Sequence, residues 1–185
     1  MALEHWRYFL ALERDFVEAA AFVEPCADNY PTYSTEFTKL ILGTCSEIDA
    51  VAKVLCTKVR PSAEPKNIDH YRSILTEAYP KLDDVEILVP RYALSFHPWS
   101  DWGNRNSPKW WTEHTEVKHH RHESFKLANL GNCLLAGAGL FALVLYLYQP
   151  ELYAGELNAT FDFFGLANGP KFLVNDESYR LPDFP

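Results

Sequence analysis

Apolar residues recur at steps of three and four residues along the N-terminal part of the chain, which predicts two amphipathic helices. The first covers residues 3–24, and Glu13 falls outside its apolar face. The second begins at a cap provided by Ser34 or Thr35 and stops before Pro61. Two helices therefore open the fold.

The middle of the chain changes its pattern. Asn67 can cap a short helix over residues 68–78. Residues 85–96 are β-like, with Pro90 in the middle, which predicts either a hairpin or a single bent strand. Residues 97–107 follow as a loop rich in Trp, Pro and Gly.

Helical signals return after this loop. Ser107-Pro108 predicts a helix start, with serine as the N-cap and proline in the first turn, for a helix that ends near residue 121. An apolar helix follows over residues 126–148 and ends at Pro150. The aromatic- and proline-rich tail, 151–185, is expected to form surface turns. The pattern as a whole predicts one mainly α domain with a small β-like insertion.

The segment 127–148 contains no charged residue and is long enough to cross a bilayer. Lys118 and Lys126 precede it, as basic residues flank many membrane spans. Asn129 and Asn132 lie in its first turns, however, and a buried central helix has the same composition. We therefore expect a buried helix, and a membrane-attached protein with a span at 127–148 is the alternative.

Composition narrows the class of protein. A chain of 185 residues with 48% hydrophobic residues is long enough for one domain with a substantial core. Its net charge of −8 means that any nucleic-acid site is local or that the ligand is small. The four cysteines lack CxxC spacing, and the N-terminus has no signal-peptide pattern, so we expect buried thiols and a cytoplasmic protein.

One segment, residues 110–123, holds four of the seven histidines. Between Arg105 and Lys126 there are five Lys or Arg and three Glu, a basic patch in an acidic chain. Such a patch suits an anion, and histidine adds proton-transfer capacity near neutral pH. A solvated helix end with cations that match its dipole is the alternative. The candidate binding residues are Lys118, His120, His122, Trp110 and Trp111.

A metal site is the other chemistry that this segment suggests. Glu116, His119, His120 and Glu123 share one helix face, and Glu116-x-x-His119 is a ligand pair of helical di-iron proteins. Those proteins need the pair twice, and the sequence holds it once. We therefore expect neither a native metal nor a cofactor.

The order of these motifs resembles HEPN-type domains. The run from Trp111 through Val117-Lys118-His119-x-Arg121, followed by Leu127-Ala-Asn-Leu and an apolar helix, is similar to their third and fourth helices. The second helix fits through residues 45–53. The resemblance implies a bundle of four or five helices, with core helices at about 3–60 and 107–149, an insertion at 61–104, and a homodimer.

The HEPN resemblance also implies a function. Many such domains are metal-independent ribonucleases of bacterial toxin–antitoxin or defence systems, and others bind nucleotides or proteins. Their motif is an arginine, usually followed by a polar residue, and then a histidine after four to six intervening residues, whereas here Arg121 follows His119. We therefore expect a module that binds RNA, a nucleotide or an antitoxin-like partner. The alternative is an endoribonuclease with His119, Arg121, His114 and Glu47 as its catalytic residues.

Overall fold

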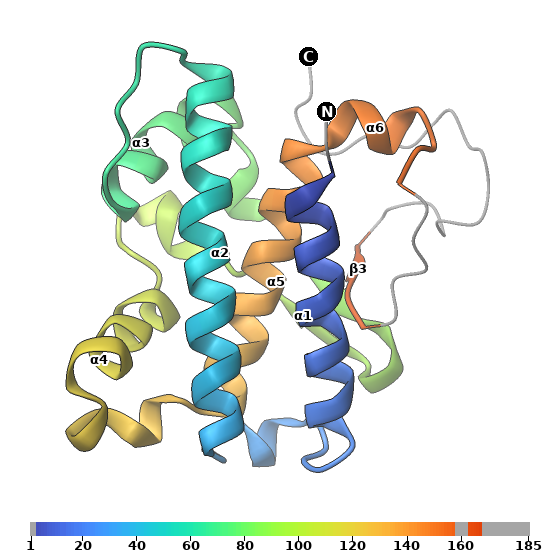
Figure 1. The fold of residues 1–185 in the computed structure, drawn as a ribbon, viewed down its shortest axis with the longest axis vertical. Helices are drawn as coiled ribbons and strands as arrows, with labels where there is room; N and C mark the ends of the chain where they lie inside the picture. Colours follow the sequence, from blue (N-terminus) through green and yellow to red (C-terminus); the bar gives the residue numbers. More distant parts are fainter. Residues whose placement is uncertain (1–2, 158–162, 168–185) are drawn as a thin grey trace.

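Six α-helices and a small sheet make up the computed structural model, which describes residues 3–157 and 163–167 (Figure 1). The predicted mainly α class with a small β insertion is confirmed. The helices are α1 (Glu4–Ala20), α2 (Thr35–Val59), α3 (Ile68–Ala78), α4 (Lys109–Ser124), α5 (Leu130–Leu147) and α6 (Gln149–Tyr153).

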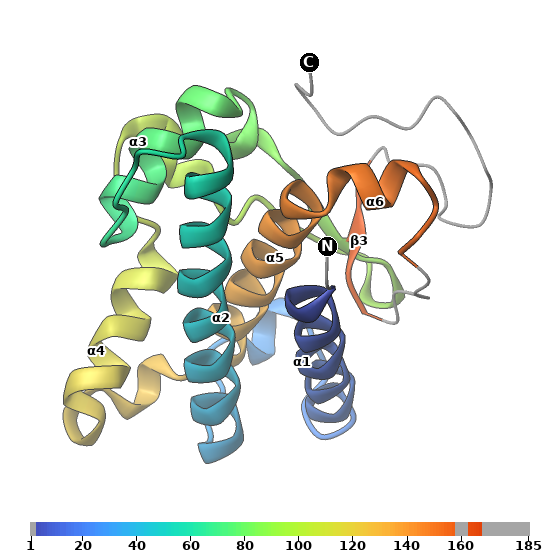
Figure 2. The same ribbon diagram turned by 45° about the horizontal axis from the view of Figure 1, so that its top comes forward.

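Helix α5 is the centre of the bundle, where it contacts α1, α2 and α4 (Figures 1 and 2). Every one of its residues except Gly131 and Leu135 is buried. By length and composition α5 could cross a membrane, but the fold itself covers it on all sides. Its apolar composition is thus accounted for by its place in the core.

Two glycines let aromatic rings approach the α5 backbone. A Cβ atom at Gly137 would lie 2.5 Å from the Phe164 ring and 2.6 Å from the Phe16 ring. A Cβ atom at Gly139 would lie 3.2 Å from the Trp110 ring. These glycines lower helix propensity, but they allow the rings of three other segments to pack against one helix.

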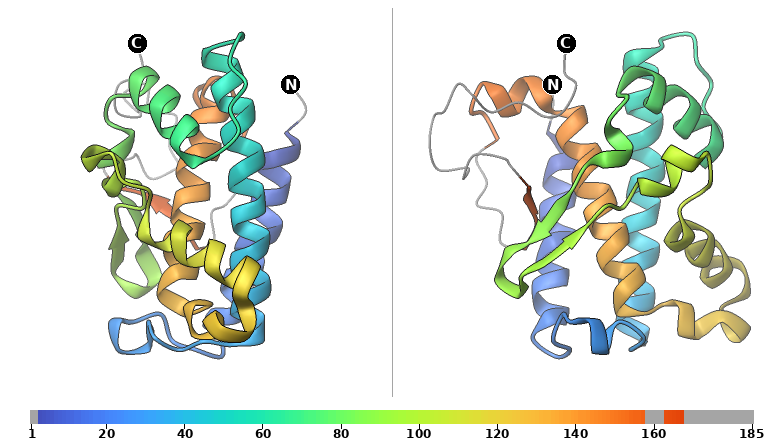
Figure 3. Two further views of the ribbon diagram at one scale, coloured as in Figure 1. Left: turned by 90° about the vertical axis from the view of Figure 1, so that its left-hand side faces the viewer. Right: turned by 180° about the vertical axis from the view of Figure 1, so that it is seen from behind.

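The β-like segment forms a hairpin, which is one of the two alternatives that the sequence predicted. Strands β1 (Ile87–Val89) and β2 (Leu94–Phe96) pair antiparallel, and Pro90–Tyr92 form the 3₁₀ turn between them. Figure 3 shows this hairpin lying beside α5, with a third strand on its other edge. That strand, β3 (Gly165–Leu166), pairs antiparallel with β1.

Two predictions about burial were wrong. Glu13 is only 3% exposed, and its Oε1 accepts backbone N–H groups from Phe163 at 3.1 Å and Phe164 at 3.0 Å. The carboxylate faces the core because it satisfies these two buried donors. Phe163 and Phe164 are buried as well, so this part of the tail packs into the core instead of forming surface turns. Residues 158–162 and 168–185 of the tail lie outside the described residues.

The predicted start of α4 was also wrong. Pro108 has an extended ψ of 137° and is itself the N-cap, so Ser107 lies outside the helix. The backbone N–H of Lys109 is instead satisfied by the carboxylate of Asp101, at 3.1 Å. A side chain eight residues earlier thus replaces the expected local cap.

The bounds of the other helices follow their local signals. Ser34 and Asn67 cap α2 and α3 as predicted. Asn129 does not lie inside the apolar helix but is its N-cap, with its side chain accepting the Asn132 N–H. Pro150 lies in the first turn of α6, directly after α5 ends.

We predict that Gly137→Ala lowers the free energy of unfolding by about 1–3 kcal/mol, because overpacking a dense core costs this much. The matched control is Gly43→Ala in α2, whose Cβ would meet Leu12 at an ordinary 3.6 Å. That substitution should leave stability unchanged or raise it by up to about 1 kcal/mol. Urea unfolding followed by circular dichroism measures both, and equal effects would contradict the close approach at Gly137.

Candidate functional site

A groove of about 840 Å³ lies between the N-terminal turns of α2 and the C-terminal half of α4. Its floor is made by the buried side chains of Thr38 and Val117. Four basic or titratable side chains from α4 line it. The lining residues are Thr35, Thr38, Leu42, Val117, Lys118, His119, Arg121, His122 and Phe125.

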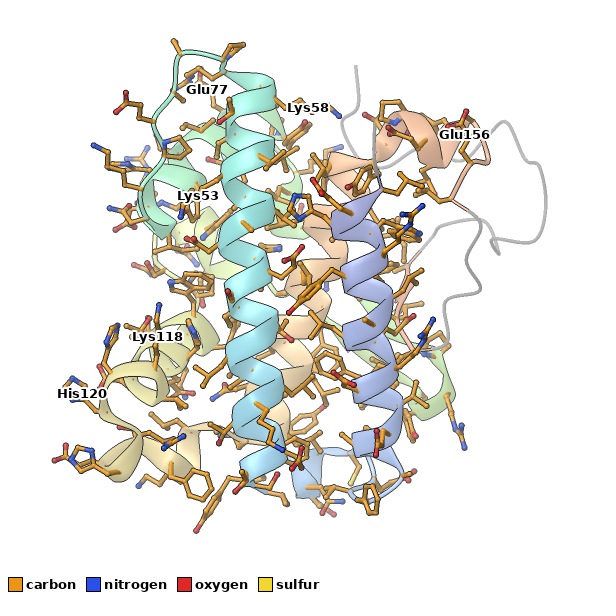
Figure 4. The ribbon with its side chains drawn as sticks, viewed as in Figure 1. Lys53, Lys58, Glu77, Lys118, His120 and Glu156 are labelled. Atoms are coloured by element: carbon orange, nitrogen blue, oxygen red, sulfur yellow. The ribbon has the colours of Figure 1, made fainter. Side chains whose placement is uncertain are left out.

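The groove carries two cationic side chains that no acidic residue in the described part of the chain pairs with. The side chains of Lys118 and Arg121 are exposed, and neither side chain makes an ion pair or hydrogen bond with the residues that the structure describes. The lining itself, all of it in the described part of the chain, includes no aspartate or glutamate. Figure 4 shows Lys118 on α4, well separated from Lys53 and Lys58 on α2. Arginine adds a planar fork of donors that matches a phosphate.

The first turn of α2 adds to this positive potential. Thr35, the first residue of the helix, lines the groove, and the Ser34 hydroxyl accepts the Phe37 N–H at 3.0 Å. The N-terminal end of a helix has partial positive charge and N–H groups without intrahelical partners. The groove therefore joins a helix N-terminus to the two cationic side chains.

Helix α4 bends beside the groove. His120 has non-helical φ and ψ of −131° and 38°, which divides the helix into two segments. His119 and His122 line the groove on either side of this bend, and His120 does not. The His122 Nε2 atom lies 3.3 Å from the Glu123 carboxylate. Of the predicted residues, the structure thus brings together Lys118, His119, Arg121 and His122.

His114 lies elsewhere and has a different character. It is 6% exposed and does not line the groove. Burial, reinforced by the positive charge of Lys118, lowers the pKa of its imidazole to about 4. The structure therefore places His114 apart from the other predicted catalytic residues of α4, His119 and Arg121.

Glu47 is also separated from the groove. Its Oε1 lies 2.6 Å from the Nδ1 atom of His5, so it orients a histidine of α1 and none of the α4 histidines. The His5 backbone N–H donates to the Tyr148 hydroxyl at 3.2 Å. These contacts join α1, α2 and the end of α5, which is a structural role.

Trp110 and Trp111, two of the candidate binding residues, pack within the protein, and so does Trp99. Trp110 is 2% exposed, and its Nε1–H donates to the Pro98 carbonyl at 2.8 Å. Trp99 donates to the Gly139 carbonyl at 3.2 Å. Trp111 is half-buried and packs against the His114 ring. Trp99 and Trp110 both contact α5 at Gly139, so they anchor α4 to the central helix.

The cysteines and acidic residues suggest no further chemistry. Three cysteines are buried free thiols, whereas Cys26 is only partly buried, which corrects the expectation for that residue. Among the described residues, no three His, Cys, Asp or Glu side chains are close enough to hold a metal ion. A smaller hollow of about 410 Å³ is lined in part by Asp101 and Glu113. Both carboxylates already accept hydrogen bonds within the protein, Asp101 from the Lys109 backbone N–H and Glu113 from the Asn132 side-chain amide.

Comparison with protein-family models, curated proteins and solved structures finds no match to this chain. The HEPN assignment therefore stays a prediction that rests on the sequence motifs. The sequence did not indicate five of the lining residues, Thr35, Thr38, Leu42, Val117 and Phe125. The first two share a helix face with Leu42 by their i, i+3, i+7 spacing, a signal that identifies a common face but not what covers it.

Proposed function

We propose that this protein binds RNA through phosphate groups held in the groove between α2 and α4. The observation that carries the proposal is the placement of Lys118 and Arg121 in one groove, unpaired within the described structure and with no carboxylate in the lining. Two cations beside a helix N-terminus suit consecutive phosphates of a nucleic-acid backbone.

The overall charge supports a short binding site. A chain with a net charge of −8 repels an extended polyanion everywhere except at a local basic patch. The groove is hollow enough to enclose a few nucleotides, and its two histidines add positive charge when they are protonated. RNA in an unpaired segment, able to enter a groove, fits this geometry better than a long duplex does.

We predict that the double substitution Lys118→Ala/Arg121→Ala weakens binding of a short RNA on the order of tenfold or more. The slope of log affinity against log salt should also fall by about 0.7 for each phosphate that the variant no longer binds. Fluorescence anisotropy with a labelled oligonucleotide, at several salt concentrations, measures both quantities.

The matched control is Lys66→Ala/Arg91→Ala, which removes the same charge from exposed positions outside the groove. Its affinity should remain within about twofold of the unmodified protein, because salt screens the interaction of exposed charges beyond about 10 Å. Equal losses of affinity in the two double variants would show that net charge, and not the groove, governs binding.

A second candidate, a metal-independent endoribonuclease, is favoured by a separate observation. His119 and His122 line the groove together with Arg121. Cleavage by the 2′-hydroxyl needs one group to take a proton, one to give a proton and a cation to stabilise the phosphorane. Two histidines and an arginine on one groove provide these three elements.

Incubation of the protein with total RNA and tRNA in EDTA tests this candidate. We expect His119→Ala to abolish cleavage, while His120→Ala, a substitution at an exposed histidine outside the groove, should preserve it. Absence of cleavage by the unmodified protein, or the same activity in both variants, would reject the endoribonuclease and leave the binding proposal standing.

A further inference from the structure

An aromatic pair, the exposed Tyr33 and the half-buried Phe125, stands at the groove. Phe125 is one of the lining residues, and the Tyr33 ring contacts it edge-to-face, with centroids 5.3 Å apart and planes at 80°. Tyr33 is 51% exposed. An open ring face therefore adjoins a residue that lines the cationic groove.

The backbone holds Tyr33 in place. The residue forms an isolated antiparallel bridge with Asn129, the N-cap of α5. Just before Tyr33 in the chain, the Thr32 carbonyl accepts the Leu130 N–H at 2.9 Å and the Tyr30 carbonyl accepts the Gly131 N–H at 3.1 Å. Because this segment is tied to the central helix, the ring loses little conformational entropy when a ligand covers it.

We propose that Tyr33, supported by Phe125, is a stacking platform for one unpaired nucleobase of the RNA whose phosphates lie at Lys118 and Arg121. The inference rests on the proposed function and names its substrate class, which is single-stranded RNA. Base–aromatic stacking needs a free base face, and the bases inside a duplex stack on one another instead.

The geometry separates two kinds of contact. Phe125 follows Arg121 by four residues and lines the same groove, so phosphate and base contacts share a single site. Lys118 and Arg121 bind the negatively charged phosphates, which every oligonucleotide has. Tyr33 binds the face of a base, which an abasic oligonucleotide lacks. The two contributions can therefore be measured independently.

Binding of two single-stranded RNAs of equal length, one with bases and one abasic, tests the platform by fluorescence anisotropy. Tyr33→Ala should weaken binding of the base-containing RNA about tenfold and leave the abasic RNA unaffected. Tyr33→Phe retains the ring and should bind both like the unmodified protein. Tyr8→Ala, at a tyrosine of α1 that is 49% exposed, is the matched control and should change neither affinity. Thermal unfolding shows that each variant is folded.

The outcomes distinguish the inference from the proposed function. Equal losses of affinity for both RNAs in Tyr33→Ala, or no loss with the base-containing RNA, overturn the platform while phosphate binding in the groove stands. If the unmodified protein binds neither RNA, the proposed function fails and the platform fails with it. A Tyr33→Phe variant as weak as Tyr33→Ala would assign the effect to the hydroxyl and would also overturn stacking.

Discussion

The burial of α5 is the constraint on which the rest of the structure depends. An eighteen-residue helix without a charged side chain must be covered on every face, because exposed apolar surface of this extent is costly in water. Three helices and the hairpin provide that cover. Glycines at positions 137 and 139 let aromatic rings sit directly on its backbone, so the covering segments are fixed in both distance and orientation.

The groove follows from this arrangement. The tryptophans around the N-terminal half of α4 bind this helix to α5, which leaves residues 118–123 exposed beside the start of α2. Side chains that have no part in covering α5 are therefore available to a ligand, and the cationic ones are Lys118 and Arg121. The chain concentrates positive potential there although its overall charge is negative.

Local signals predicted much of this fold and only part of the site. Caps such as Ser34 act on the next three residues, so the sequence alone locates them. The burial of Glu13 could not be predicted, because its partner Phe163 lies 150 residues away on a segment with no strand signal. The basic patch between Arg105 and Lys126 was recognisable from the composition of that segment. Tyr33 was not, since its neighbour Phe125 belongs to a distant part of the chain.

The most direct test of an RNA-binding groove is an NMR titration of the ¹⁵N-labelled protein with a short single-stranded RNA. The measurement identifies the residues whose backbone amide resonances shift. If RNA binds in the groove, the shifts are concentrated at residues 33–42 and 117–125, the two segments that form the groove and its aromatic end. Shifts centred instead on the smaller hollow around Asp101 and Glu113, or no shifts at all, would contradict it.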